Sequence, residues 1–132
     1  MKIDHIGIAV KSLAEAVKVY ANAIGLKQSG YDQVDEQGVR VAMFEIGDSR
    51  IELLEPTRPD SPIEKFMAKR GEGIHHIAFA VDDIEAEMKR LKDAGFIWLN
   101  EKPVPGADNK LVCFLHPKNT NGVLIELCME KS

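Results

Sequence analysis

An internal repeat constrains the fold of this chain more strongly than any other feature of its sequence. The segment IDHIGIAV at residues 3–10 returns as IHHIAFAV at residues 74–81, and four of their last seven positions are identical. A second pair, RIELLEP at 50–56 and LIELCME at 124–130, shares Ile-Glu-Leu. The offset is 71 residues between the two histidines (76 − 5) and 74 between the two glutamates (126 − 52). A repeat of this kind predicts two similar structural modules.

The segments between the repeated ends predict one helix in each module. Ser12 and Glu15 form a capping-box pattern, and apolar residues then follow at helical spacing up to Gly25. In the second module Asp82 and Glu85 form the same pattern, and Gly95 ends the helix. The apolar positions of the two expected helices are Leu13, Ala16, Val17, Tyr20 and Ile24 in the first, and Ile84, Met88 and Leu91 in the second.

Three strands are expected after each helix. They cover residues 28–34, 39–47 and 50–55 in the first module, and 96–102, 110–116 and 123–130 in the second. Between the modules, the proline-rich segment 56–62 predicts a loop, and Ser61, Pro62 and Glu64 predict the start of a short linker helix. We therefore expect an α+β fold of two tandem βαβββ modules in one domain, 1–132: module one at 1–56, a linker helix at 57–72 and module two at 73–132.

Composition narrows the class of protein. The 132 residues are long enough to bury a core, and a formal net charge of −4 argues against nucleic-acid binding. No apolar run approaches the roughly 20 residues that a membrane span needs, and the start MKIDHIG is too short and polar for a signal peptide. Cys113 and Cys128 lie in apolar strand-like runs and predict buried thiols in a reducing compartment. The sequence predicts a cytoplasmic protein that does not contact a membrane.

Each repeated first strand places a histidine on a face with small residues. Because strand side chains alternate, His5 shares its face with Gly7 and Ala9, and His76 shares its face with Ala78 and Ala80. The opposite faces, which carry Ile6, Ile8 and Val10 and Ile77, Phe79 and Val81, are expected to belong to the core. One such histidine is usually structural, but two at equivalent positions beside small residues suggest a site.

The repeated last strand of each module carries a glutamate, so each module has one histidine and one carboxylate. Glu52 lies between Ile51 and Leu53, and Glu126 lies between Ile125 and Leu127. An ionised carboxylate in an apolar strand needs a partner, although each one alone could face water from a one-sided sheet. Two histidines and two glutamates at equivalent positions together predict a mononuclear site for a divalent metal, with open coordination positions.

These motifs resemble the vicinal oxygen chelate superfamily and, within it, the methylmalonyl-CoA epimerase family. The closer resemblance depends on DHIGIAV, EQGVRVAMFEIG, IELLEP, DSPIEKF, GEGIHHIAFAVDDI and FLHPKNTNGVLIEL, which together span nearly the whole chain. It implies a curved, cup-like mixed sheet with the helices outside. It also implies metal ligands at His5, Glu52, His76 and Glu126, with Co²⁺ expected first and Mn²⁺, Ni²⁺ or Zn²⁺ as alternatives, methylmalonyl-CoA as substrate, and a homodimer.

The chain departs from this resemblance at Val41. Some epimerases of the family carry a glutamate there, which is proposed as one of two catalytic bases, and valine cannot transfer a proton. We therefore predict that Glu126 and Glu52 are the catalytic acid/base residues, with Glu45 as a weaker candidate. In the HPKN segment, Lys118 and His116 are predicted to bind the substrate.

Three functions remain open at this point. The first is a metal-dependent epimerase that acts through a metal-stabilised enolate. The second is a glyoxalase-type lyase or another enzyme of the superfamily. The third is a metal-free module of the same fold that binds a small molecule, which would not require the histidines and glutamates.

Overall fold

The computed structural model describes residues 1–131, which form two compact units. The module-one unit comprises residues 5–75, and the module-two unit comprises residues 1–4 together with 76–131. Within the described residues, no helix is long and apolar enough to cross a membrane.

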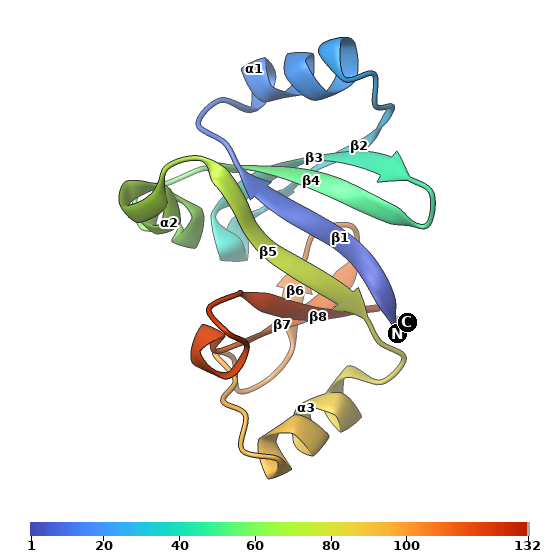
Figure 1. Cartoon of the computed structure of the whole chain (residues 1–132), viewed down its shortest axis with the longest axis vertical. Helices are drawn as coiled ribbons and strands as arrows, with labels where there is room; N and C mark the ends of the chain where they lie inside the picture. The colour runs from blue at the N-terminus through green and yellow to red at the C-terminus, as the bar shows by residue number, and fades with distance from the viewer. Residues whose placement is uncertain (132) are drawn as a thin grey trace. The chain divides into compact units, whose positions relative to one another are not determined.

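The module-one unit follows the predicted βαβββ order and then adds the linker helix (Figure 1). Its strands lie in the order β2-β3-β4-β1, with β1 parallel to β4 and the other neighbours antiparallel. The elements are β1 (Lys2–Ala9), α1 (Leu13–Val17), β2 (Gln28–Val34), β3 (Val39–Ile46), β4 (Ser49–Pro56) and α2 (Pro62–Arg70). The three predicted strands are therefore confirmed to within a residue at each end, and Ser61 caps α2 as predicted, accepting a hydrogen bond from the Ile63 N–H.

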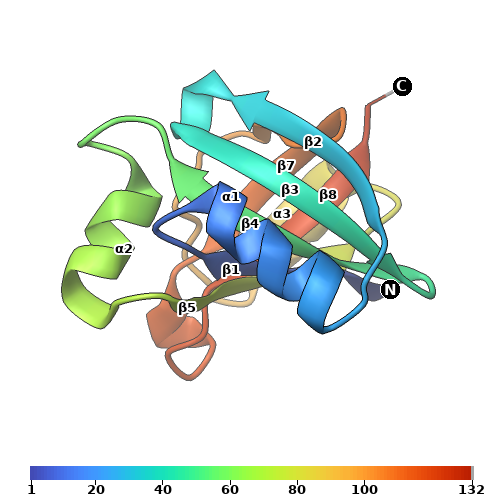
Figure 2. The ribbon, with the colours of Figure 1, turned by 90° about the horizontal axis from the view of Figure 1, so that it is seen from above.

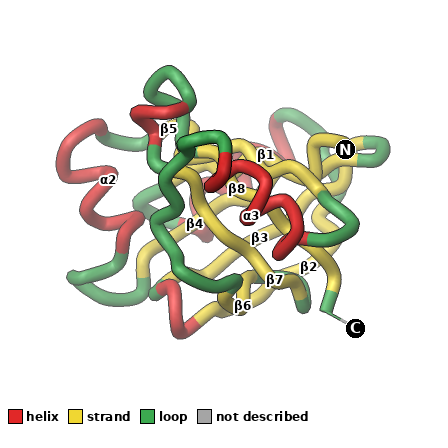
Figure 3. The backbone as a smooth tube through the Cα atoms, turned by 90° about the horizontal axis from the view of Figure 1, so that it is seen from below, coloured by secondary structure: helices red, strands yellow, loops and turns green. Residues whose placement is uncertain are grey.

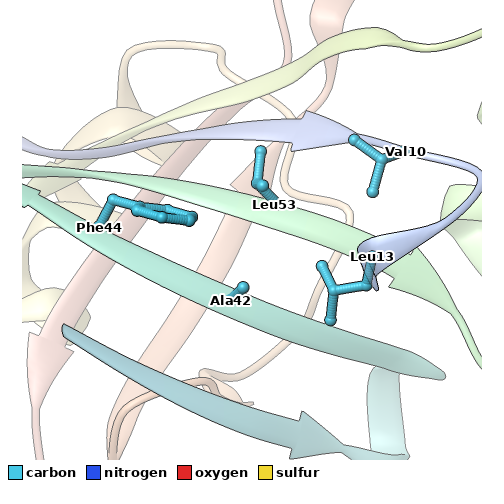
Figure 4. Packing of buried hydrophobic residues seen from close by; sticks show 5 residues of the cluster. All are labelled: Val10, Leu13, Ala42, Phe44 and Leu53. Atoms are coloured by element: carbon cyan, nitrogen blue, oxygen red, sulfur yellow. The ribbon is translucent and has the colours of Figure 1, made fainter. Parts of the chain in front are cut away.

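The core of this unit lies between α1 and the sheet. Helix α1 packs across β3 and β4 (Figures 1 and 2). Figure 4 shows the five buried side chains of this cluster, which come from the β1–α1 segment, β3 and β4: Val10, Leu13, Ala42, Phe44 and Leu53. Phe44 and Leu53 are completely buried. Half-buried Ile8 also packs here, so the face of β1 opposite His5 belongs to the core, as expected.

The helix predicted to end at Gly25 is not α-helical throughout. After α1 the chain continues as a π-helical segment, η1 (Lys18–Ala23), in which the Ile24 N–H donates to the Val19 carbonyl at 2.9 Å. The wider π turn changes which residues face the sheet. Tyr20 still packs on the core, but Ile24 is exposed, so its predicted place in the buried stripe was wrong.

The module-two unit repeats the order with β5 (Gly73–Ala80), α3 (Ile84–Asp93), β6 (Val104–Gly106), β7 (Lys110–Leu115) and β8 (Ile125–Glu130). Its strands lie in the order β5-β8-β7-β6, with β5 parallel to β8. Helix α3 packs against this sheet next to β8 (Figure 3). The apolar cluster beneath it contains Ile84, Met88, Cys113 and Leu127, with Phe79 and Val81 packed against it as predicted.

Two predictions for the second module were wrong. The helix cap is Asp83 rather than Asp82, because the Asp83 carboxylate accepts the Ala86 N–H at 3.0 Å, which is the usual N-cap to N3 bond. The strand expected at 96–102 is replaced by β6, beyond Pro103. In the predicted range Trp98 forms an isolated bridge to Leu115, and its indole N–H donates to the Met88 carbonyl. Backbone bonds flank this bridge on both sides, and pairing stops where the Phe114 N–H donates to the Asn100 side chain instead of a backbone carbonyl.

Candidate active site

The module-one unit brings His5 and Glu52 together on one face of its sheet. His5 lies on β1 and Glu52 on the neighbouring parallel strand β4, where the backbone of Glu52 is opposite Gly7. Nδ1 of His5 is 3.4 Å from Oε2 of Glu52, and both side chains are buried, with exposed fractions of 5% and 3%. Gly7, which has no side chain, is the residue of β1 that lies opposite Glu52.

A third polar group, Arg50, contacts the same carboxylate. Its Nη2 atom is 3.1 Å from Oε2 of Glu52, and its side chain is largely buried. Arg50 is not among the residues that the sequence predicts for the site. Strand alternation could have found it, because residues 50 and 52 lie on one face of β4.

The module-two unit contains the equivalent pair. Nε2 of His76 on β5 is 3.1 Å from Oε1 of Glu126 on β8, with exposed fractions of 5% and 4%. The Phe114 ring meets the His76 ring edge to face, with 5.9 Å between centroids. The same face carries the buried side chains of Ala78, Val112 and Cys128 and, by strand alternation on β7, the buried lysine Lys110.

A buried ion pair lies in the same unit. Nζ of Lys110 on β7 donates to Oδ1 of Asp4 at 2.6 Å, and both residues are 7% exposed. The pKa of the Cys128 thiol is raised above its usual range, mainly by burial and to a smaller extent by the negative charges of Asp4 and Glu126. Burial and the charge of Glu126 raise the pKa of the Cys113 thiol to about 12. Both thiols therefore remain protonated and uncharged at neutral pH.

The other residues selected from the sequence are less enclosed. His116 and Lys118 lie in the loop between β7 and β8, which contains a short 3-10 turn, η3 (Pro117–Asn119), and Nδ1 of His116 accepts the Lys118 N–H at 3.1 Å. Lys118 is exposed and His116 is half-buried. Glu45 is exposed at the end of β3, whereas Val41 is buried on the strand face that also carries Glu52.

The donor chemistry of both pairs fits a divalent metal ion. Imidazole nitrogen and carboxylate oxygen are ligands that Zn²⁺, Co²⁺, Mn²⁺ and Ni²⁺ accept. Each unit supplies one of each from adjacent parallel strands, at equivalent positions of the repeat. Buried carboxylates beside imidazoles can also transfer protons, so the pairs suit acid/base chemistry as well as metal binding.

The family of the chain follows from comparison with known proteins. A model of the Glyoxalase/Bleomycin resistance protein/Dioxygenase superfamily matches residues 4–114, and the chain belongs to this superfamily. Within it the chain is 41% identical to the ethylmalonyl-CoA/methylmalonyl-CoA epimerase of Cereibacter sphaeroides, over 96% of each chain. It is 40% identical to the human mitochondrial methylmalonyl-CoA epimerase, over 96% of this chain and 72% of the human protein.

A solved structure extends the similarity to the fold. A variant of the Streptomyces coelicolor methylmalonyl-CoA epimerase in complex with 2-nitronate-propionyl-CoA superposes with a TM-score of 0.96. It is 41% identical in sequence, and the match covers 100% of this chain and 96% of that one. The predicted fold class and the predicted family resemblance are both confirmed. These relatives are epimerases and therefore isomerases.

Proposed function

We propose that this chain is a metal-dependent epimerase that interconverts (R)- and (S)-methylmalonyl-CoA. The observation that carries the proposal is the buried histidine–glutamate pair, which occurs once in each unit at equivalent positions of the repeat. The epimerase names of relatives about 40% identical over nearly the whole chain support the choice of reaction and substrate.

The proposed ligands are His5, Glu52, His76 and Glu126, which would share one divalent ion, Co²⁺ first and Mn²⁺, Ni²⁺ or Zn²⁺ as alternatives. When bound, the ion supplies a Lewis acid for the thioester oxygen and the free carboxylate, and this stabilises the negative charge of an enolate. The burial of His76 and Glu126 limits the access of water to that charge.

In this proposal the two glutamates move the protons. Epimerisation removes the α-proton from one face of the substrate and returns a proton to the opposite face. A single rigid carboxylate cannot serve both faces, so we assign one face to Glu126 and the other to Glu52. One glutamate accepts the α-proton as the C–H bond breaks, and the other, protonated, donates to the opposite face of the enolate carbon.

Deuterium exchange tests the reaction and both roles. The cobalt-loaded chain is incubated with racemic methylmalonyl-CoA in heavy water, and deuterium at the α-carbon is followed by mass spectrometry. We expect deuterium in both epimers. In Glu52→Gln and in Glu126→Gln, exchange should persist in one epimer, a different one for each variant, while inversion collapses. Absence of deuterium from the wild-type reaction would exclude the epimerase, and inversion of Glu52→Gln at the normal rate would exclude Glu52 as a base.

Metal content separates this proposal from a metal-free binding module. We expect the purified chain to retain about one divalent ion and to lose activity when a chelator removes it. Activity that survives complete removal of the ion would exclude metal dependence. Turnover of a hemithioacetal, without deuterium exchange into methylmalonyl-CoA, would instead indicate the glyoxalase-type lyase.

The proposal assigns substrate binding to Lys118 and His116, in the loop that precedes the strand of Glu126. A lysine that holds a phosphate or carboxylate away from the reacting carbon contributes equally to ground state and transition state. We therefore expect Lys118→Ala to raise KM and leave kcat unchanged. An unchanged KM would remove Lys118 from the binding site, and Lys131→Ala, at an exposed position after β8, serves as the control.

The homodimer and the cytoplasmic location are also part of this proposal. The homodimer is supported by the family resemblance, and the location by two buried thiols that suit a reducing compartment. Light scattering of the purified chain tests the first, with twice the monomer mass of 14.7 kDa as the expected result. A monomer mass across the micromolar range would contradict it.

A further inference from the structure

The two copies of the repeat differ at the position two residues before each glutamate. Module one has Arg50 before Glu52, whereas module two has Leu124 before Glu126. On β4 strand alternation puts Arg50 on the same face as Glu52, whereas Leu124 precedes β8, which begins at Ile125. Module one therefore places a cation beside its glutamate where module two has an aliphatic side chain.

The contacts of Arg50 connect it to both members of the module-one pair. Its Nη2 atom is 3.1 Å from Oε2 of Glu52, the same oxygen that lies 3.4 Å from Nδ1 of His5. The strand register places Arg50 beside His5 of β1 and opposite Glu45 of β3. Its side chain is 15% exposed, so this ion pair is shielded from the solvent that weakens surface pairs.

We propose that Arg50 is a positioning residue that orients the Glu52 carboxylate for metal binding. A guanidinium presents its N–H donors in a rigid plane, which fixes the direction of a carboxylate better than the flexible ammonium of lysine. Groups that hydrogen-bond to a metal ligand typically change metal affinity by about 10- to 100-fold when they are removed. The inference rests on the proposed metal-dependent function. It adds that the two glutamates are held differently, because Leu124 cannot orient Glu126 in this way.

Cobalt binding tests this role without relying on activity. The full-length chain is stripped of metal and titrated with Co²⁺, and both the affinity and the visible cobalt absorption are recorded. We expect Arg50→Met to weaken cobalt binding by about 10- to 100-fold and to alter the absorption. Arg50→Lys, which keeps the charge and loses the planar donor geometry, should recover part of the affinity and not all of it.

Arg40→Met is the matched control. Arg40 forms an ion pair with Glu55, at 2.6 Å, between β3 and β4 of the same unit, and Glu55 is not a proposed ligand. Its removal should leave cobalt affinity and absorption unchanged. The same loss of affinity in Arg40→Met would show that any broken ion pair in this sheet weakens binding, which would refute a specific role of Arg50.

The other possible results of the cobalt titration separate a failure of the proposed function from a failure of the role of Arg50. If the wild-type chain binds no cobalt or other divalent ion, the proposed function fails and the role of Arg50 fails with it. If the wild-type chain binds cobalt and Arg50→Met binds it equally well with the same absorption, only the positioning role is refuted. If Arg50→Met does not fold, Arg50→Lys decides the question, because an affinity equal to wild type would show that the planar guanidinium is not needed.

Discussion

Breaking the buried ion pair between Asp4 and Lys110 should lower the stability of the fold strongly, although neither residue belongs to a histidine–glutamate pair. Nζ and Oδ1 are 2.6 Å apart, and each residue is 7% exposed. At an effective dielectric constant of about 20, two unit charges at this separation attract by about 6 kcal/mol. Removing both from water costs several kcal/mol for each ion, so the intact pair contributes little net stability.

Loss of one partner has a different consequence, because the other charge stays buried after its opposite charge is removed. We expect Lys110→Met to lower the free energy of unfolding by about 3 to 5 kcal/mol, and Asp4→Asn to act in the same direction. A domain of this size is stable by roughly 5 to 15 kcal/mol, so the single variants should lose a large part of their stability. The double variant should be more stable than either single variant.

Urea denaturation of the wild type, both single variants and the double variant gives the coupling energy directly. The exposed pair Lys89–Asp93 on α3, whose atoms are 2.7 Å apart, is the control and should contribute less than about 1 kcal/mol. If Lys110→Met costs no more than removal of Lys89, burial does not control the energy of the Asp4–Lys110 pair and the reasoning is wrong.

Three further predictions concern the core, a helix cap and a buried thiol. Phe44→Ala should lower the free energy of unfolding by about 3 to 5 kcal/mol, because Phe44 is completely buried; urea denaturation checks this, and a loss under about 1 kcal/mol would contradict it. Ser61→Ala should cost about 1 kcal/mol in the same assay, since Ser61 caps α2, whereas Ser61→Gly should cost less. Burial raises the pKa of the Cys113 thiol from an unfolded value of 9.0 to about 12, so the folded chain keeps a proton that the unfolded chain loses. The contribution of Cys113 to stability should therefore be constant below about pH 9 and fall as pH rises from about 9 to 12, and Cys113→Ala should show a smaller fall over that range.

The order of elements could be predicted because the repeat indicates it twice. The strands at 28–34 and 39–46 are indicated by their β-forming residues and by the turns between them. The strand that was predicted at 96–102, and that the structure does not form, shows the limit of such patterns. Its apolar residues fit a strand, but Trp98 instead packs beside α3 and donates to Met88, a contact that local sequence does not reveal.

The repeat also explains part of the geometry of the candidate site. Each histidine lies beside the glutamate of its own module, because the first and last strands of a βαβββ module pair in parallel. The Asp4–Lys110 pair could not be predicted in this way. Its members are 106 residues apart, and the repeat does not point to them, because the second copy has His75 at the position that aligns with Asp4.

The differences between the two copies bear on the mechanism as much as their similarity does. An enolate is planar, and inversion requires proton transfer at both of its faces, so two carboxylates on separate modules suit the proposed reaction. The surroundings of those carboxylates are unequal: Glu52 is paired with the cation Arg50 as well as with His5, while Glu126 lies beside His76 and near the protonated thiols of Cys113 and Cys128. A carboxylate held by a guanidinium loses orientational freedom, whereas a buried carboxylate beside an imidazole interacts strongly with any charge that is bound nearby. If the proposed function holds, forward and reverse exchange rates should therefore respond unequally to Glu52→Gln and Glu126→Gln, and equal responses would show that the divergence of the copies has no catalytic consequence.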